Sequence, residues 1–300
     1  MPEFHQSRVV KAAPFWPSSP HVMDRTSLDM LHTFFDFVKM EWPARDVSNI
    51  SGSHPHLTYL AGEEETQALT FAGLLERPDL DILWAVRGGY GALRWASRIL
   101  KTTHIHEKIP MILGFSDVSF LHLAMFKLDK KGIHGPMIAT LKTTSKESIY
   151  ALKAALKDMT FPALRGTPYR DGRARGRLLP VNLSCLAASL RTPLEPDLET
   201  SPVILALEDH NEPVYRIDRL LTQLREAEVL GKVRGIAMGR LMLRETEEKM
   251  KLQYLMKELL GPLNCPVVLD LPFGHGPDNM PLLVGEDYFL DGDSGVLMKC

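Results

Sequence analysis

Two segments of the chain share one pattern, in which an apolar run ends in a tight turn that opens an amphipathic helix. The first reads ILWAVRGGYGALR and the second reads PMILGFSDVSFLHLA, with apolar runs at 80–86 and 109–115. Repeated strand–turn–helix units predict a parallel sheet with helices on both faces. Ligands of such sheets bind at the carboxyl ends of the strands, so both turns are expected beside a ligand site.

The two turns carry complementary chemistry. Gly88, Gly89 and Gly91 leave backbone N–H groups near a helix N-terminus, where an anion can be held. Ser116 lies where the second strand stops, and Asp117 follows at the start of a helix. A serine on such a turn beside free backbone N–H groups is how hydrolases form a nucleophile and its oxyanion hole. The pattern predicts a serine hydrolase, although G-F-S-D lacks the second glycine of the usual G-x-S-x-G turn.

Composition narrows the possible partners and compartment. The 300 residues are 45% hydrophobic, and 35 basic side chains nearly balance 37 acidic ones, which does not favour nucleic acid or an acidic membrane surface. The N-terminal segment lacks a signal-peptide core, and no apolar run is long enough to span a membrane. Cys185, Cys265 and Cys300 are too scattered for a disulfide framework or a zinc site. We expect a cytoplasmic protein without a metal or other cofactor.

The pattern of elements changes about halfway along the chain. Residues 1–160 predict an N-terminal parallel-sheet domain of flavodoxin- or amidotransferase-like type, with helices at 24–42, 63–75, 92–100, 117–128 and 146–158. Residues 161–178, rich in Pro, Gly and Arg, predict a linker. Residues 179–300 predict a smaller mixed β/α domain. Its expected elements are helices at 183–190, 215–228 and 245–260, strands at 202–208 and within VRGIAMGRL and PVVLDL, and a hairpin-like LLVGEDYFLDGDSGVLMK.

A serine nucleophile needs a base, and the base needs a third group that fixes its tautomer. His275 is the best candidate base, because it lies in the glycine-flanked loop PFGHGPDN directly after an apolar strand. Glu208 ends the strand PVILALE and is the candidate third member. Asp209 and Glu212 compete with it for that role.

Six blocks of sequence occur in an order typical of one family. They are RGGYGALR, GFSDVSFLHLA, HGPM, NLSCLAASLRTP, LALEDHNEPVYRIDRLLTQLR and LPFGHGPDN, between Tyr59 and Asn279. In these blocks the chain resembles the LD-carboxypeptidases, serine peptidases that include the microcin C immunity hydrolases. The resemblance implies that Ser116 is the nucleophile, Glu208 the triad acid and His275 the base. It also implies a site in a cleft between the two domains.

The resemblance further implies an oxyanion hole and a substrate. The hole would be the amides of Asp117 and of one glycine of RGGYG, Gly89 in preference to Gly88. The implied reaction hydrolyses an L,D amide bond and releases terminal D-alanine from a small peptide, cytoplasmic murein tetrapeptide, during peptidoglycan recycling. The family also implies a homodimer. A carboxypeptidase must recognise a free carboxylate, for which the candidates are Gly88 and Tyr90 in the turn, Arg87 and Arg240.

Two alternative functions and two departures from the family pattern stand beside this prediction. A microcin C-type immunity hydrolase would cleave a peptidyl or aminoacyl adenylate analogue, and Trp16 or Tyr90 could then stack on the base. A non-catalytic ligand-binding α/β protein is an alternative of another class. The departures are Pro180-Val181, which replace glycines before NLS in a loop expected to border the cleft, and the bulky Phe15-Trp16 after the first strand.

Overall fold

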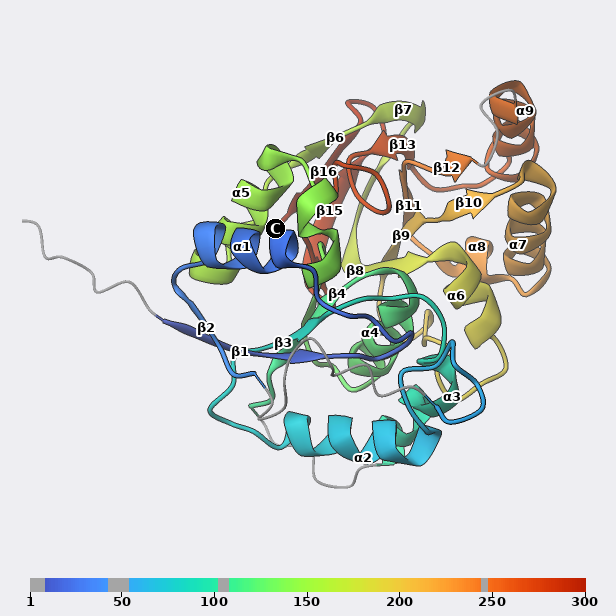
Figure 1. The fold of residues 1–300 in the computed structure, drawn as a ribbon. Helices are drawn as coiled ribbons and strands as arrows, with labels where there is room; N and C mark the ends of the chain where they lie inside the picture. Colours follow the sequence, from blue (N-terminus) through green and yellow to red (C-terminus); the bar gives the residue numbers. More distant parts are fainter. Residues whose placement is uncertain (1–8, 43–53, 102–107, 244–247) are drawn as a thin grey trace, which may run out of the picture.

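The computed structural model describes residues 9–42, 54–101, 108–243 and 248–300 (Figure 1). Across these ranges the chain forms two large sheets with helices packed against them. The first sheet and its helices are coloured mainly blue to green in Figure 1, and the second sheet and its helices mainly yellow to red. The α/β class predicted from the alternation of elements is therefore confirmed.

The first sheet is parallel in five of its six strands, which have the order β14-β5-β4-β3-β1-β2. Only β14 runs antiparallel, along β5. The strands are β1 (Val10–Phe15), β2 (Val38–Met40), β3 (Ile82–Ala85), β4 (Met111–Gly114), β5 (Gly132–His134) and β14 (Leu282–Val284).

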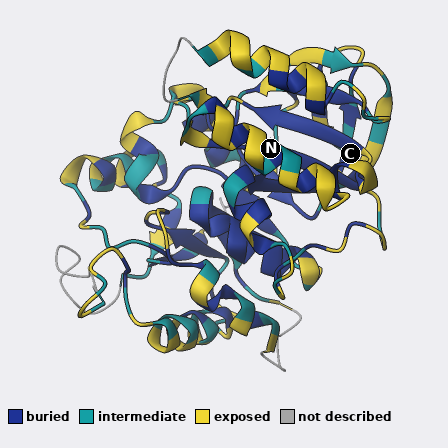
Figure 2. Cartoon of the chain, turned by 90° about the vertical axis from the view of Figure 1, so that its right-hand side faces the viewer, coloured by how far each residue is buried: buried dark blue, intermediate teal, exposed yellow. Residues whose placement is uncertain are grey.

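Helices cover both faces of this sheet, as a fully buried strand such as β3 requires. Leu83 and Ala85 of β3 pack in one hydrophobic cluster with α2 (Glu64–Leu75), α3 (Leu93–Ala96) and α4 (Ser119–Lys127). Ile82 and Trp84 point the other way, into a cluster with α1 (Arg25–Phe34) and α5 (Lys146–Asp158). Figure 2 shows buried strands inside helices that are partly exposed.

The second sheet is mixed, with the order β6-β16-β15-β8-β9-β11-β13-β7. Its centre, β8-β9-β11-β13, is parallel, and the outer strands are antiparallel. The strands are β6 (Leu164–Arg165), β7 (Thr167–Arg170), β8 (Arg173–Asn182), β9 (Val203–Glu208), β11 (Gly235–Gly239), β13 (Val267–Leu271), β15 (Asp287–Asp291) and β16 (Val296–Lys299). Accompanying elements are α6 (Leu183–Ser189), α7 (Val214–Glu226), α8 (Val229–Lys232), α9 (Lys249–Leu259) and the paired β10 (His210–Glu212) and β12 (Met242–Leu243).

Residues 161–178 are not a linker, because they contain β6, β7 and the first part of β8. The strands β6 and β7 form the two edges of the second sheet, where polar side chains and glycine turns are tolerated. The Pro, Gly and Arg content of these edge strands therefore resembles that of a linker. The proposed domain limits also divide the first sheet, because β14 comes from the C-terminal half and pairs with β5.

Three other predicted elements differ from the structure. The helix expected over 24–42 ends at Phe34, and β2 follows it. The hairpin-like C-terminal segment splits: β15 and β16 form the hairpin, whereas Leu282–Val284 joins the first sheet. The helix expected from 245 is described from Lys249, and 244–247 lie outside the described residues. In the described part of the chain, the helices are all too short or too polar to cross a membrane.

Candidate active site

Ser116 lies on a sharp turn between β4 and the 3₁₀ turn that leads into α4. Its φ of 63° lies in the left-handed region, which is strained for a residue with a side chain. Gly88 makes the space for this turn, since a Cβ built there would stand 3.2 Å from Ser116 Oγ. Ser116 is half-buried.

His275 and Glu208 form a hydrogen-bonded pair at the ends of two strands of the second sheet. His275 Nδ1 lies 2.5 Å from Glu208 Oε2, and the Glu208 side chain is fully buried. Burial alone would lower the pKa of His275, but the Glu208 carboxylate outweighs it and raises that pKa above its ordinary value. Burial acts to raise the pKa of Glu208, yet His275 and its other partners hold it below the usual range. The pair therefore favours an ionised carboxylate beside the imidazole.

Asp209 and Glu212 are bonded elsewhere. Asp209 Oδ2 accepts hydrogen bonds from the backbone N–H and the hydroxyl of Ser184 at the start of α6. Glu212 pairs with Arg216 at 3.3 Å. Of the three acids that the sequence left open, Glu208 is the one bonded to His275.

Asn182 is a member of the site that sequence reasoning missed. It is the N-cap of α6, where its side-chain oxygen accepts from the Cys185 N–H. Its Nδ2 donates to Glu208 Oε1 at 3.3 Å and to Asp209 Oδ1 at 3.1 Å. One amide thus caps a helix and orients the Glu208 carboxylate. The only signal in the sequence was its place in the NLS block.

Aromatic rings surround His275 on other sides. The ring of Phe115, the residue before Ser116, meets it edge-on with centroids 4.8 Å apart, which joins the serine turn to the histidine loop. The ring of His210 stacks on it at 4.8 Å with planes 6° apart.

His134, in the HGPM block, is fully buried with Nε2 4.0 Å from Glu208 Oε1. Burial lowers the pKa of His134 to about 4, so it is neutral at neutral pH. Sequence reasoning assigned no role to His210 or His134.

Asp117 connects the serine turn to the glycine-rich turn. Its Oδ2 accepts from the Ala92 N–H at 2.8 Å, and the Gly91 N–H is a further partner of this carboxylate. Burial raises the pKa of Asp117 to about 6, against the opposing effect of these hydrogen bonds. Gly88 and Gly89 differ in their surroundings: Gly88 packs on Ser116, whereas Gly89, with φ 112°, packs on the Ser19 side chain.

The candidate substrate-binding side chains have different surroundings. Arg240 forms an ion pair with Asp278 at 2.6 Å and thereby braces the loop that carries His275. Arg87 is exposed beside Gly88; burial lowers the pKa of His21, and the charge of Arg87 lowers it further. Tyr90 is exposed, with its ring 5.9 Å from that of Tyr59.

The two departures from the family pattern lie outside the immediate site. Pro180 and Val181 are not in a loop: they are buried in β8, opposite Ala206 and Leu207 of β9. This register places the next residue, Asn182, opposite Glu208.

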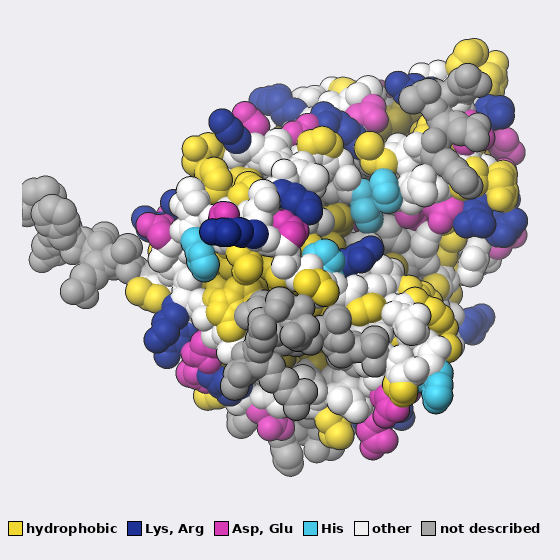
Figure 3. All heavy atoms as spheres, in the orientation of Figure 1, with side chains coloured by type: hydrophobic (Ala, Val, Ile, Leu, Met, Phe, Trp, Pro, Cys, Tyr) yellow, Lys and Arg dark blue, Asp and Glu magenta, His cyan; other side chains and the backbone are white. Residues whose placement is uncertain are grey.

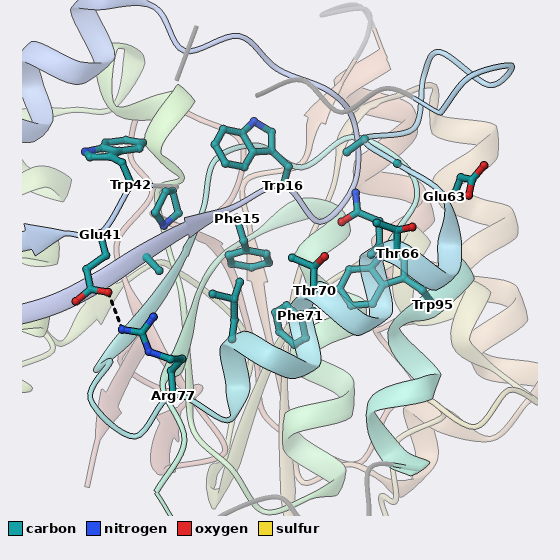
Figure 4. Close-up of a pocket in the computed structure, with 16 residues that line it drawn as sticks. Phe15, Trp16, Glu41, Trp42, Glu63, Thr66, Thr70, Phe71, Arg77 and Trp95 are labelled. Atoms are coloured by element: carbon teal, nitrogen blue, oxygen red, sulfur yellow. Dashed lines mark hydrogen bonds and ion pairs between the residues drawn. The ribbon is translucent and has the colours of Figure 1, made fainter. Parts of the chain in front are cut away.

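Phe15 and Trp16 line a cavity of about 580 Å³ between β1 and α2, where Glu41 pairs with Arg77 (Figure 4). None of Ser116, Glu208 and His275 lines that cavity.

Metal-binding chemistry and surface charge add little to the site. The described residues contain no cluster of three or more His, Cys, Asp or Glu side chains that could hold a metal ion. On the face drawn in Figure 3, basic and acidic side chains are interspersed.

Comparison with known proteins identifies relatives along most of the chain. Residues 17–135 match the model of the LD-carboxypeptidase N-terminal domain, and residues 175–290 match that of the C-terminal domain. A putative carboxypeptidase of Synechocystis is 36% identical over 82% of this chain and 81% of its own. The murein tetrapeptide carboxypeptidase of Pseudomonas aeruginosa is 28% identical over 78% of this chain and 80% of its own.

Two solved structures share the fold. Muramoyltetrapeptide carboxypeptidase from Oxalobacter formigenes superposes with a TM-score of 0.79 at 23% identity, covering 96% of this chain and 97% of the other. MccF in complex with glutamyl sulfamoyl guanosine superposes with a TM-score of 0.74 at 16% identity, covering 97% and 95%.

Proposed function

Because the chain belongs to the LD-carboxypeptidase family, we propose that it is a serine peptidase that hydrolyses the amide bond before a terminal D-amino acid. The single observation that carries this proposal is the hydrogen bond between His275 and the buried Glu208. The His275 ring of that pair contacts the ring of Phe115, and Phe115 directly precedes Ser116 on its strained turn. A nucleophile, a base and an orienting acid are the three groups of a serine-hydrolase triad.

In the proposed mechanism, His275 Nε2 takes the Ser116 hydroxyl proton as Ser116 Oγ bonds to the substrate carbonyl carbon. Glu208 keeps the Nδ1 proton in place and stabilises the imidazolium. The imidazolium then protonates the leaving nitrogen as the C–N bond breaks, which frees the D-amino acid and leaves an acyl-enzyme. Water attacks this ester while His275 takes its proton, and return of that proton to Ser116 Oγ releases the shortened peptide.

Backbone N–H groups would stabilise the oxyanion of the tetrahedral intermediate. We assign this role to the amides of Asp117 and Gly89. The close approach of Gly88 to Ser116 supports this assignment, because it puts the glycine-rich turn next to the residue that would attack the carbonyl. The Asp117 carboxylate supports the same assignment indirectly, because it holds that turn through Ala92.

The substrate we propose is a cytoplasmic murein tetrapeptide that loses its terminal D-alanine during peptidoglycan recycling. The name of the Pseudomonas aeruginosa relative supports this choice. Of the two candidate arginines, Arg87 is better suited to the terminal carboxylate, because Arg240 is already paired with Asp278. A guanidinium on a carboxylate gives the charge-assisted, bidentate contact that such recognition needs.

A second candidate is hydrolysis of aminoacyl adenylate analogues, favoured by the exposed ring of Tyr90 beside the glycine-rich turn. Tyr90 and Tyr59 present aromatic surface on which a base could stack. Trp16 is less suited, because it lines the separate cavity and its indole N–H donates to the His21 carbonyl.

One assay separates these functions. Purified protein is given murein tetrapeptide, the same peptide with its terminal D-alanine amidated, and an aminoacyl sulfamoyl-adenosine. We expect release of D-alanine from the free peptide and slower turnover of the amide, because the amide loses the charge-assisted contact between its carboxylate and Arg87. Arg87→Met should raise KM for the free peptide but leave KM for the amidated peptide unchanged. The control is Arg94→Met, which replaces an exposed arginine paired with Glu64 and should change neither KM value. Preferential turnover of the adenylate analogue would select the second candidate.

A further inference from the structure

His210 is the one aromatic partner of His275, among those the structure describes, that stacks parallel on the ring. The two imidazole centroids are 4.8 Å apart and the planes differ by 6°. Stacked rings with centroids at such a distance are a favoured arrangement for aromatic pairs. His210 is exposed, yet it covers a face of an imidazole that keeps only 17% side-chain exposure.

The backbone of His210 is fixed by the same network that holds the Glu208 carboxylate. The His210 N–H donates to Asp209 Oδ1 at 2.8 Å, and the same oxygen accepts from Asn182 Nδ2. His210 also pairs with Met242 in the short β10–β12 ladder. The stacked ring therefore projects from an anchored position next to Glu208 in sequence.

The hydrogen bond to Glu208 leaves some motion of the His275 ring for the stack to restrict. It holds the Nδ1 edge of the ring, but small coupled rotations about χ1 and χ2 can still move the opposite edge, which carries Nε2. Phe115 limits this rotation on one side through its edge-on contact. A flat ring lying on a face of His275 limits it further, and thereby aims Nε2.

We propose that His210 is a positioning residue for His275, which fixes the plane of the imidazole by stacking on it. This proposal rests on the proposed function in one respect, because it takes His275 to be the general base. Burial and the neighbouring His275 lower the pKa of His210, so at neutral pH the stack contains no second cation to oppose the imidazolium formed in the reaction.

Three substitutions separate stacking from simple space-filling. His210→Phe keeps a flat ring, His210→Leu keeps apolar bulk without one, and His210→Ala removes both. Loss of the stack should lower kcat by about tenfold in the Ala and Leu variants with KM within about twofold, because a misaimed base affects the chemical step. The Phe variant should stay within about threefold of the wild type. Equal activity of the Phe and Leu variants, or an unchanged Ala variant, would overturn the proposal.

An NMR measurement on the resting protein tests the same proposal without substrate. The proton of the short bond between His275 Nδ1 and Glu208 should give a low-field signal in the wild type and in His210→Phe. In His210→Leu and His210→Ala that signal should broaden by exchange with water as the ring moves. The same sharp signal in all four proteins would overturn the proposal. A protein with the expected NMR pattern that turns over no peptide would refute the proposed function alone.

Discussion

Gly274 lies so close to Glu208 that a Cβ built at position 274 would stand 2.8 Å from both the Glu208 Cβ and Oε2. Gly274 also has a φ of 104°, which side-chain-bearing residues rarely adopt. The glycine before His275 is therefore required for the loop to bring the imidazole onto the carboxylate.

Gly274→Ala should displace Glu208 from His275 and lower kcat/KM at least tenfold. It should also cost about 1–3 kcal/mol of stability through backbone strain. Gly276→Ala is the matched control, because a Cβ there meets no atom closer than 3.9 Å. Urea unfolding and peptide hydrolysis measure both effects. Equal behaviour of the two variants would show that the close approach at Gly274 is not needed.

Asn182→Ala should impair activity beyond its effect on stability. Loss of the N-cap of α6 costs about 1 kcal/mol, and loss of the donor to Glu208 should lower kcat several-fold as the carboxylate reorients. Asp24→Ala is the control, because Asp24 caps α1 through the Ser27 N–H and lies outside the site. The account of Asn182 is wrong if both cap variants lose stability equally and neither loses kcat.

Asp117→Asn should change how stability depends on pH. The carboxyl has a folded pKa of about 6 against an unfolded value near 4. The folded state therefore holds the proton more tightly, and titration of this carboxyl lowers wild-type stability by roughly 2 kcal/mol as pH rises from 4 to 6. Asparagine does not titrate, so the variant should gain stability relative to the wild type over that range. Urea unfolding at pH 4, 5, 6 and 7 measures the difference, and a constant difference would contradict the assignment.

The acid limb of kcat/KM should lie above pH 6.5, because the Glu208 carboxylate raises the pKa of His275 and the base must be neutral. Glu208→Gln should move that limb to lower pH, since burial, which lowers the pKa, then acts without the carboxylate. The same variant should lose kcat as the imidazolium loses its partner. A limb that stays in place in Glu208→Gln would mean that the titrating group is not His275.

The sequence predicted the parts of the fold and site that depend on local pattern. The strand–turn–helix units at Gly88 and Ser116 form as expected, because apolar runs and glycine turns encode them directly. The contact of Glu208 with His275 came from the order of blocks along the chain. Asn182 and His210 were missed because their contacts depend on the register of β8 against β9 and on where β10 turns. The edge strands at 164–170 were missed because edge composition resembles that of a loop.

The most direct test of the proposed chemistry is the rate at which purified protein releases D-alanine from murein tetrapeptide, measured for the wild type and Ser116→Ala side by side. We expect the wild type to release D-alanine and the variant, with an unchanged unfolding transition, to be slower by about three orders of magnitude or more. A folded Ser116→Ala protein that releases D-alanine at the wild-type rate would contradict a serine nucleophile at position 116.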